Sequence, residues 1–229
     1  GGTPKGKAAA RKYGPEIKID HLMKLTIQHQ EKYSRGELLL RTFPGWIYIY
    51  LPHWLLLIFA GLWGLVLLLV AFWVIVFTGR YPEPMFQYLA GFLKWITRVE
   101  ARLFNLCDGY PAFGIRASDN RTDLDIPYPE QVNRGLTVAR LLLGIFYVLI
   151  PHGLVLLFRG IFVLILLIAA WWVVLVTGRF PGRIHRWAVE QIRWQLRIDA
   201  YLMFMTDRYP PFTGKELPHE AAGASTGTS

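Results

Sequence analysis

Residues 41–82 read RTFPGWIYIYLPHWLLLIFAGLWGLVLLLVAFWVIVFTGRYP, and residues 140–181 read RLLLGIFYVLIPHGLVLLFRGIFVLILLIAAWWVVLVTGRFP. The second stretch matches the first without a gap after a shift of 99 positions. The same register extends over residues 35–113 and 134–212, and 27 of the 73 pairs that begin at Arg41 are identical. Because rare residue types such as Trp, His and Pro are among the matches, the register predicts a tandem duplication.

Composition indicates a membrane protein. The chain has 229 residues, of which 53% are hydrophobic and nine are Trp, and its formal net charge is +9. High apolar content combined with a basic charge is typical of membrane segments with positive flanks, and it argues against a nucleic-acid partner. The single cysteine, Cys107, excludes an internal disulfide. The first 16 residues are polar and basic, so we expect no cleavable secretory signal there.

The repeat divides the chain into five parts. We predict a basic cytoplasmic segment, a first repeat, a linker, a second repeat and a flexible tail, over residues 1–34, 35–113, 114–133, 134–212 and 213–229. Residues 17–33 alternate loosely between apolar and charged types. This alternation leaves a short strand and an interfacial helix both open.

The apolar run of residues 42–78 decides the number of membrane spans. As one helix it has a length of about 55 Å, whereas the hydrocarbon core of a bilayer is about 30 Å thick. We therefore predict two spans that turn at Ala60 and Gly61, and an equivalent turn at Arg159 and Gly160. An arginine costs less free energy in an interfacial turn than at the bilayer centre.

The basic residues agree with this hairpin interpretation. Of the 25 Lys and Arg residues, nine lie in residues 1–41, eight in 79–140 and seven in 179–229. With two hairpins, all three basic segments face the cytoplasm, as the positive-inside rule requires. The sequence thus predicts an all-α integral membrane protein with four transmembrane spans, cytoplasmic termini and two copies that run in the same direction.

Each apolar run ends with the same signal. Thr-Gly-Arg-x-Pro stops a helix, because Gly79 and Gly178 can adopt a left-handed conformation and proline cannot continue the helix. We expect Arg80 and Arg179 to contact the negative helix end and lipid phosphates.

An amphipathic stretch follows each stop. Residues 85–106 and 184–205 carry apolar residues at helical spacing, which predicts two helices that lie in the cytoplasmic interface. The predicted lipid or interface contacts on these helices are Lys94, Trp95, Arg98, Trp194 and Arg197.

The motif Asp-x-Tyr-Pro-x-Phe, which begins at Asp108 and at Asp207, closes each unit. The residue that precedes a proline is pushed into an extended conformation, so we expect the helix to end here. The two tyrosine rings are then available as anchors at headgroup depth.

These motifs resemble a known family. Pro-His in an apolar run, then Thr-Gly-Arg-Tyr-Pro, then Trp-x-x-Arg, then Thr-Asp-Arg-Tyr-Pro-Pro-Phe is similar to a bacterial membrane family of unknown function, number 4389 in the domain-of-unknown-function series. The resemblance covers about residues 31–113 and 130–213, as two tandem copies. The first copy departs from the motif at Cys107, Gly109 and Ala112. The resemblance implies a recurrent architecture and no particular activity.

One repeated set of residues is a candidate for a chemical role. It consists of Tyr48, Pro52 and His53 and of their counterparts Tyr147, Pro151 and His152. Each proline frees the carbonyl of the tyrosine four residues earlier, and a neighbouring histidine can donate to that carbonyl. A second interpretation makes the two histidines face each other across a symmetry axis, where they bind a haem or pigment, or relay a proton. Neither copy has the further ligands of a zinc or di-metal site, so we expect no metal.

No motif of catalysis is present: the sequence lacks a phosphate-binding loop, a nucleophile elbow, paired intramembrane carboxylates and a zinc-protease motif. We therefore expect a non-catalytic accessory or scaffolding subunit of a larger complex in the bacterial inner membrane. Its expected partners are other integral membrane subunits and phospholipids, in particular anionic ones. The alternative is a cofactor-binding or lipid-handling protein that uses the Pro-His sites, and an enzyme acting on lipids is a third possibility.

Overall fold

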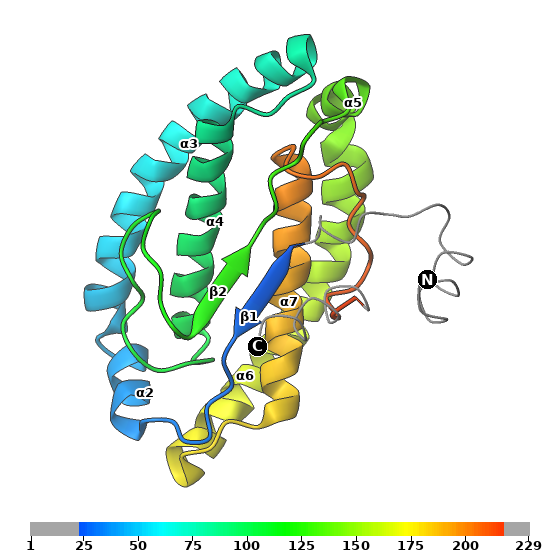
Figure 1. Cartoon of the computed structure of the whole chain (residues 1–229). Coiled ribbons are helices and arrows are strands. Elements are labelled where there is room, and N and C mark those ends of the chain that lie inside the picture. The colour runs from blue at the N-terminus through cyan, green and yellow to red at the C-terminus, as the bar shows by residue number, and fades with distance from the viewer. Residues whose placement is uncertain (1–22, 218–229) are drawn as a thin grey trace, which may run out of the picture.

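The computed structural model describes residues 23–217, and it consists of two similar halves built mainly of helices (Figure 1). Each half contains a short strand, a long apolar helix that includes a π-helical turn, and a returning amphipathic helix. In the first half these are β1 (Lys24–Ile27), α2 (Arg35–Thr42), η1 (Trp46–Tyr50), α3 (Leu51–Thr78) and α4 (Glu83–Leu103). In the second half they are β2 (Thr122–Asp125), α5 (Arg134–Gly144), η2 (Ile145–Leu149), α6 (Ile150–Thr177) and α7 (Gly182–Leu202).

The ends of the long helices follow from local sequence. Ser34 and Asn133 cap their beginnings, because each side chain accepts a hydrogen bond from a backbone N–H in the first turn. Gly79 and Gly178 end them at φ angles of +72° and +68°, and this left-handed conformation favours glycine. The structure therefore confirms the helix stop predicted from Thr-Gly-Arg.

The predicted hairpin turns are wrong. Helix α3 continues through Ala60 and Gly61, and α6 continues through Arg159 and Gly160. The described residues contain two helical segments that are long and apolar enough to cross a membrane, Trp46–Thr78 and Arg134–Thr177, and not four.

Local contacts explain why no turn is needed at these positions. Arg159 forms an ion pair with Glu190 at 2.9 Å and lies over the ring of Trp187, so its charge is compensated inside a continuous helix. A β-carbon at Gly61 would lie 3.2 Å from the ring of Phe92. This glycine thus lets α4 approach α3 closely, and it is not a turn residue.

The two halves are related by an approximate two-fold axis, with each half beginning where the other ends. The backbone N–H of Tyr33 donates to the carbonyl of Gly178 at 2.9 Å, and Val132, 99 residues after Tyr33, donates to Gly79 at the same distance. The start of each long helix therefore lies beside the end of the other, and the two long helices are antiparallel (Figure 1). The prediction that both copies run in the same direction is wrong.

An antiparallel ribbon of β1 and β2 lies on this axis. Leu25 pairs with Leu124, its own counterpart in the repeat, so the axis passes through this pair. The ribbon crosses α4 and α7 about halfway along the molecule (Figure 1). For the part of residues 17–33 that the structure describes, the strand alternative is the correct one.

The main core lies between the ribbon, α4, α7 and the inner faces of α3 and α6. Helices α4 and α7 confirm the two predicted amphipathic helices, but their apolar faces are buried against the protein. In contrast, the outer faces of the long helices are exposed and apolar over almost their full length. Exposed side chains on these faces include Leu39, Phe43, Trp46, Trp54, Phe59, Trp63, Trp73, Phe77, Leu142, Phe146, Leu157, Phe158, Ile165, Trp172 and Val176.

Candidate functional site: two Pro-His aromatic clusters

The Pro-His motif of the second half forms a closed hydrogen-bonded chain. The indole Nε1 of Trp194 donates to Nδ1 of His152 at 3.0 Å. The imidazole Nε2 lies 3.1 Å from the hydroxyl of Tyr209, and that hydroxyl donates to the carbonyl of Tyr147 at 2.8 Å. The ring of Phe212 stacks on His152 with centroids 3.9 Å apart. We call Tyr147, His152, Trp194, Tyr209 and Phe212 the aromatic cluster of the second half. Their counterparts Tyr48, His53, Trp95, Tyr110 and Phe113 form the aromatic cluster of the first half.

The chain of bonds assigns the histidine tautomer. An indole N–H can only donate, so Nδ1 of His152 accepts and the neutral ring carries its proton on Nε2. The proton on Nε2 then points to the oxygen of Tyr209, whose own hydroxyl proton is donated to the carbonyl of Tyr147. This is the carbonyl that Pro151, four residues later, leaves without a helical partner. A tyrosine from the closing motif therefore satisfies the freed carbonyl, in the role that the sequence interpretation gave to histidine.

The first half repeats this arrangement with one bond missing. Trp95 donates to Nδ1 of His53 at 2.9 Å, Phe113 stacks on the ring, and Tyr110 donates to the carbonyl of Tyr48 at 3.0 Å. However, Nε2 of His53 is buried and has no hydrogen-bond partner among the described residues. The clusters thus share one arrangement and differ at Nε2 of the histidine and at the hydroxyl of Tyr147, which lies 3.1 Å from that of Tyr201 whereas the position equivalent to Tyr201 is Arg102.

This geometry gives little support to a haem or pigment ligated by the two histidines. Each histidine is enclosed by a tryptophan and a phenylalanine of its own repeat, so His53 and His152 do not face each other. Both side chains are fully buried, Nδ1 is occupied by tryptophan, and Nε2 carries the proton, so neither nitrogen offers a free lone pair. Within residues 23–217, no group of three or more His, Cys, Asp or Glu residues is placed to hold a metal ion.

Four side chains predicted to contact lipid are buried. Trp95 and Trp194 are 4% exposed, and their indole N–H groups donate hydrogen bonds to the histidines. Their assignment to the lipid interface is therefore wrong. Arg98 and Arg197 are also buried. The spacing Trp-x-x-Arg puts tryptophan and arginine one turn apart on one helix face, so burial of one implies burial of the other.

These two arginines hold the loop that closes each repeat. Arg98 donates to the carbonyls of Ala112 and Gly114, and Arg197 donates to those of Thr213 and Lys215. The arginines thereby fix the segment that carries Phe113 and Phe212 over the histidine rings. Charge and periodicity on the helix do not reveal this role, because the loop carbonyls that the arginines bind lie 14 to 18 residues away in the sequence.

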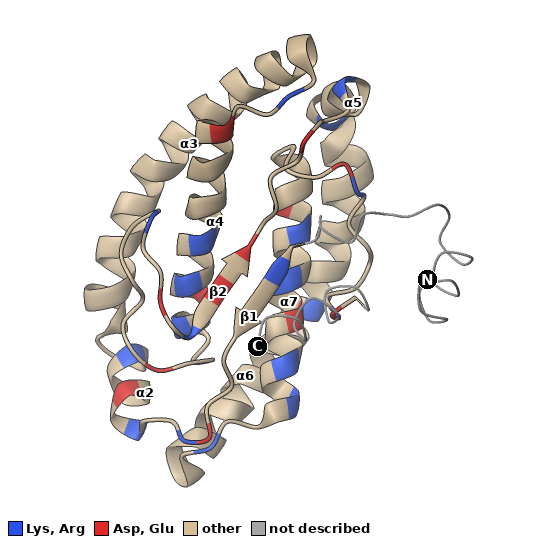
Figure 2. Ribbon diagram, in the orientation of Figure 1, with Lys and Arg blue, Asp and Glu red and all other residues tan. Residues whose placement is uncertain are grey.

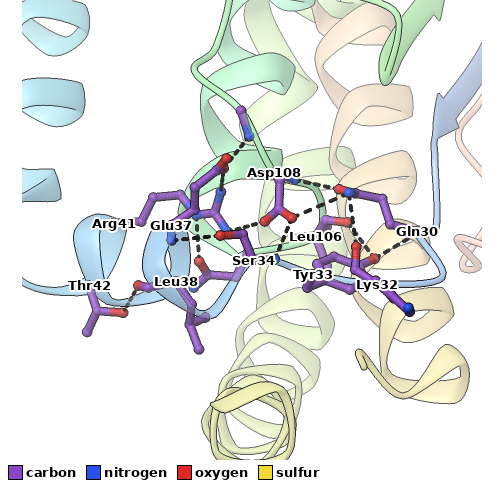
Figure 3. Close-up of polar contacts among 12 residues, drawn as sticks. Gln30, Lys32, Tyr33, Ser34, Glu37, Leu38, Arg41, Thr42, Leu106 and Asp108 are labelled. Atoms are coloured by element: carbon purple, nitrogen blue, oxygen red, sulfur yellow. Dashed lines mark hydrogen bonds and ion pairs between the residues drawn. The ribbon is translucent and has the colours of Figure 1, made fainter. Parts of the chain in front are cut away.

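Asp108 and Asp207 organise the beginning of each long helix. One carboxylate oxygen of Asp108 accepts from the backbone N–H of Ser34 and the other accepts from Arg41, both at 2.8 Å, as Figure 3 shows. The backbone N–H of Asp108 donates to Gln30. In the second half, Asp207 accepts from the backbone of Asn133 and forms an ion pair with Arg140. The closing motif is thus tied to the N-terminal cap of its own repeat.

The remaining predicted lipid contacts are accessible. Arg80 and Arg179 are exposed at the ends of the long helices, and Lys94 is partly exposed beside an open cleft of about 730 Å³. Arg35 lies near Gly178 and donates to the carbonyl of Val176, and Arg134 lies near Gly79. Each end of the molecule therefore carries a pair of exposed arginines drawn from both repeats, Arg35 with Arg179 at one end and Arg80 with Arg134 at the other.

A pair of equivalent carboxyl groups was not identified from the sequence. Glu100 on α4 and Asp199 on α7 are separated by the repeat offset and lie close enough to interact. Burial and the neighbouring Asp199 raise the pKa of Glu100 to about 7, and burial raises the pKa of Asp199 to about 6. A comparison of the two repeats reveals the Glu and Asp as a conservative match, but gives no sign of their burial.

Comparisons with known proteins identify the repeat unit. Residues 42–114 and 138–214 each match the family model described as Domain of unknown function (DUF4389), and together they cover about two thirds of the chain. Neither the curated proteins nor the solved structures gave a match. The two matches contain both aromatic clusters and the helices α3 and α6. The chain therefore belongs to the DUF4389 family and carries two tandem copies of its domain.

Proposed function

We propose that this protein is a non-catalytic scaffolding or accessory subunit of a bacterial inner-membrane complex. In this proposal the exposed apolar faces of the two long helices, from α2 to α3 and from α5 to α6, pack against lipid acyl chains and against the helices of partner subunits. We call these faces the apolar layer. The single observation that carries the proposal is the size and continuity of this layer, which is exposed along both long helices. Apolar patches of this extent mark membrane or protein contacts.

The interior of the molecule supports a structural role. The tryptophan N–H, the histidine Nδ1 and the closing tyrosine hydroxyl of both aromatic clusters are used in contacts within their own repeat. Arg41, Arg98, Arg140 and Arg197 likewise hold caps and loops. Such contacts stabilise a rigid framework, and within the described residues they do not converge on a place where a substrate could react.

The proposal is tested by purification of the full chain from bacterial membranes in a mild detergent, with mass spectrometry and an absorption spectrum on the same sample. We expect the protein in the membrane fraction, with other membrane subunits at a fixed ratio and without a visible chromophore. Protein that stays in the soluble fraction would overturn the membrane assignment. A coloured preparation without partners would overturn the scaffolding role in favour of a cofactor-binding protein.

A matched pair of substitutions ties the result to the apolar layer. Trp63→Asp places a charge in the exposed apolar face of α3, whereas Asp123→Lys changes a charge on the exposed face of the ribbon. We expect Trp63→Asp to reduce the membrane-bound fraction and the recovery of partners several-fold, and Asp123→Lys to leave both unchanged. Equal behaviour of the two variants would show that the apolar layer is not the contact surface.

A further inference from the structure

The apolar layer is longer, along the two helices, than the hydrocarbon core of a bilayer is thick. Exposed apolar side chains extend from Leu39 to Phe77 on the first long helix and from Leu141 to Val176 on the second. Residues 134–177 form one continuous helical segment, and at 1.5 Å per residue its part from Leu141 to Val176 measures roughly 54 Å, whereas a hydrocarbon core is about 30 Å thick. Helices that crossed the membrane upright would expose almost half of this apolar surface to water.

The charged ribbon also argues against an upright orientation. Because the ribbon lies on the approximate two-fold axis, it is located halfway between the two ends of the long helices. Its outer face carries the exposed side chains of Lys24, Asp123 and Asp125. In a molecule that spans the bilayer, these charges would be close to the mid-plane of the membrane, where charged side chains are least favourable.

Charged and apolar residues are separated onto different faces of the molecule. Figure 2 shows Lys, Arg, Asp and Glu on α4, α7, the ribbon, the connecting loops and the short first helices α2 and α5, whereas α3 is free of charges. On α6, the sole charged residue is Arg159, which forms an ion pair with Glu190 of α7. This separation is typical of a protein that lies on a membrane with one face immersed.

The exposed tryptophans fit the same orientation. Trp46, Trp54, Trp63 and Trp73 are more than half exposed and occur at intervals along the first long helix. Helices that span a membrane concentrate Trp in two belts, one at each interface. A distribution along the whole helix is expected when the whole helix lies near a single interface.

Basic residues at both ends of the molecule indicate that the lipid headgroups in contact with it are anionic. Exposed Arg35 and Arg179 lie together at one end, and exposed Arg80 and Arg134 lie together at the other. With the long helices parallel to the membrane surface, both pairs reach the same headgroup layer. Arginine binds phosphate oxygens with several donors, so anionic phospholipids complement the two pairs.

We propose that α3 and α6 lie parallel to the membrane plane within a single leaflet, with the two-fold axis along the membrane normal and the two arginine pairs bound to anionic lipids of that leaflet. This inference rests on the membrane role proposed above and specifies its geometry. The ribbon, α4 and α7 then face the aqueous side, and the protein is held by one leaflet without crossing the bilayer.

Cysteine labelling distinguishes this arrangement from a spanning one. Glu83→Cys and Arg183→Cys place thiols at opposite ends of the molecule, and Asp123→Cys places one on the ribbon; all three positions are exposed. Each is introduced into the full chain with Cys107→Ser, and Cys107 itself is buried, so the otherwise unchanged protein is an alternative background. Inside-out and right-side-out membrane vesicles are then treated with a membrane-impermeant maleimide.

We expect all three thiols to react in the same vesicle orientation. Labelling of the two ends in opposite orientations, or protection of the ribbon thiol in both, would overturn the in-plane arrangement. Those results would leave the membrane role intact, because the protein would still be in the vesicles. Absence from the vesicles altogether would instead refute the proposed function, so the two failures are distinguishable.

Binding to synthetic vesicles tests the headgroup assignment. We expect detergent-diluted protein to float with vesicles of phosphatidylcholine and phosphatidylglycerol at least several-fold better than with phosphatidylcholine alone. Replacement of Arg35, Arg80, Arg134 and Arg179 by Gln should abolish this difference, whereas Arg116→Gln and Arg121→Gln, in the segment before β2, should preserve it. Equal flotation of the unchanged protein with both vesicle types would contradict the role of the arginine pairs.

Discussion

Nε1 of Trp194 donates to Nδ1 of His152 at 3.0 Å, across 42 residues of sequence. The equivalent bond between Trp95 and His53, at 2.9 Å, has the same sequence separation. Each bond connects the returning amphipathic helix to the first turn of α3 or α6, at the position where proline interrupts the helical hydrogen bonds. The chain thus contains two versions of one structural device, and each version is an internal comparison for the other.

Loss of the tryptophan donor should destabilise the fold. Trp194→Phe keeps most of the aromatic contact and leaves Nδ1 of the buried His152 without a partner, so we expect a loss of about 1–3 kcal/mol in unfolding free energy. Thermal unfolding in detergent measures the change. Trp172→Phe, at an exposed position of α6, is the matched control and should change stability by less than about 0.5 kcal/mol. An equal effect of the two substitutions would show that the indole N–H bond contributes nothing.

The two clusters should respond differently to loss of the tyrosine hydroxyl. Tyr209→Phe removes a bond to His152 and a bond to the carbonyl of Tyr147, whereas Tyr110→Phe removes only the bond to the carbonyl of Tyr48. We expect Tyr209→Phe to cost about 1 kcal/mol more than Tyr110→Phe, since one additional buried group loses its partner. Denaturation of both variants under identical conditions provides the comparison. A larger effect in the first half would contradict the assigned difference between the clusters.

Substitution by alanine should change stability in opposite directions at two glycines, one inside α6 and one at its C-terminal cap. Gly178 ends α6 at φ +68°, so Gly178→Ala forces a left-handed alanine and should cost about 1–2 kcal/mol. Gly153 lies inside α6, where a β-carbon would meet no atom within 4 Å, and Gly153→Ala should stabilise by about 0.5–1 kcal/mol. Thermal unfolding of both variants decides the signs. Destabilisation by Gly153→Ala would mean that this face of α6 is in contact with a partner.

The paired carboxyl groups predict a pH-dependent stability. Because burial and Asp199 raise the pKa of Glu100 to about 7, the folded protein binds a proton that the unfolded chain releases above about pH 4.5. This contribution therefore weakens folding as the pH rises toward 7. Glu100→Gln cannot ionise, so it should be more stable than the parent protein by about 1–2 kcal/mol at pH 8 and similar to it at pH 5.

A difference between variant and parent is the proper measure of this effect. Burial lowers the pKa of His185 to about 4, and this histidine destabilises the fold as the pH falls below about 6.5, in the opposite direction. The His185 contribution is common to both proteins and cancels. Glu83→Gln removes an exposed carboxylate from the same helix and is the control. If the Glu100→Gln difference is the same at pH 5 and pH 8, the proposed proton uptake does not occur.

The local structure of this fold was accessible from sequence, and its long-range geometry was not. The repeat register, the glycine stops at Gly79 and Gly178 and the two amphipathic helices all arise from neighbouring residues, and the structure confirms them. The hairpin turns and the parallel copies were inferred from bilayer thickness and charge. Both inferences assumed that each apolar segment crosses the membrane perpendicularly, and they failed when the helix continued through Gly61 and Gly160.

The aromatic clusters show the same limit. His53 and His152 and the carbonyls of Tyr48 and Tyr147 could be selected from sequence, because a proline stands next to each histidine and four residues after each tyrosine. The tryptophan and tyrosine partners lie 42 to 62 residues away, and their contacts depend on how the returning helix packs. Identical spacing of the Trp, Tyr and His residues in both copies was the available signal, since a residue set repeated as a whole indicates a shared environment.

The ribbon on the two-fold axis has a consequence for the origin of the chain. Leu25 pairs with its own counterpart Leu124, and the cap of each long helix meets the end of the opposite one, so the contact between the halves is isologous. An isologous contact is what two identical subunits form when they assemble as a homodimer. The tandem gene is therefore well explained as the fusion of an ancestral homodimer, in which the segment before β2 became the covalent tether. Later divergence was then free to act on one half at a time, as the unequal partners of His53 and His152 illustrate.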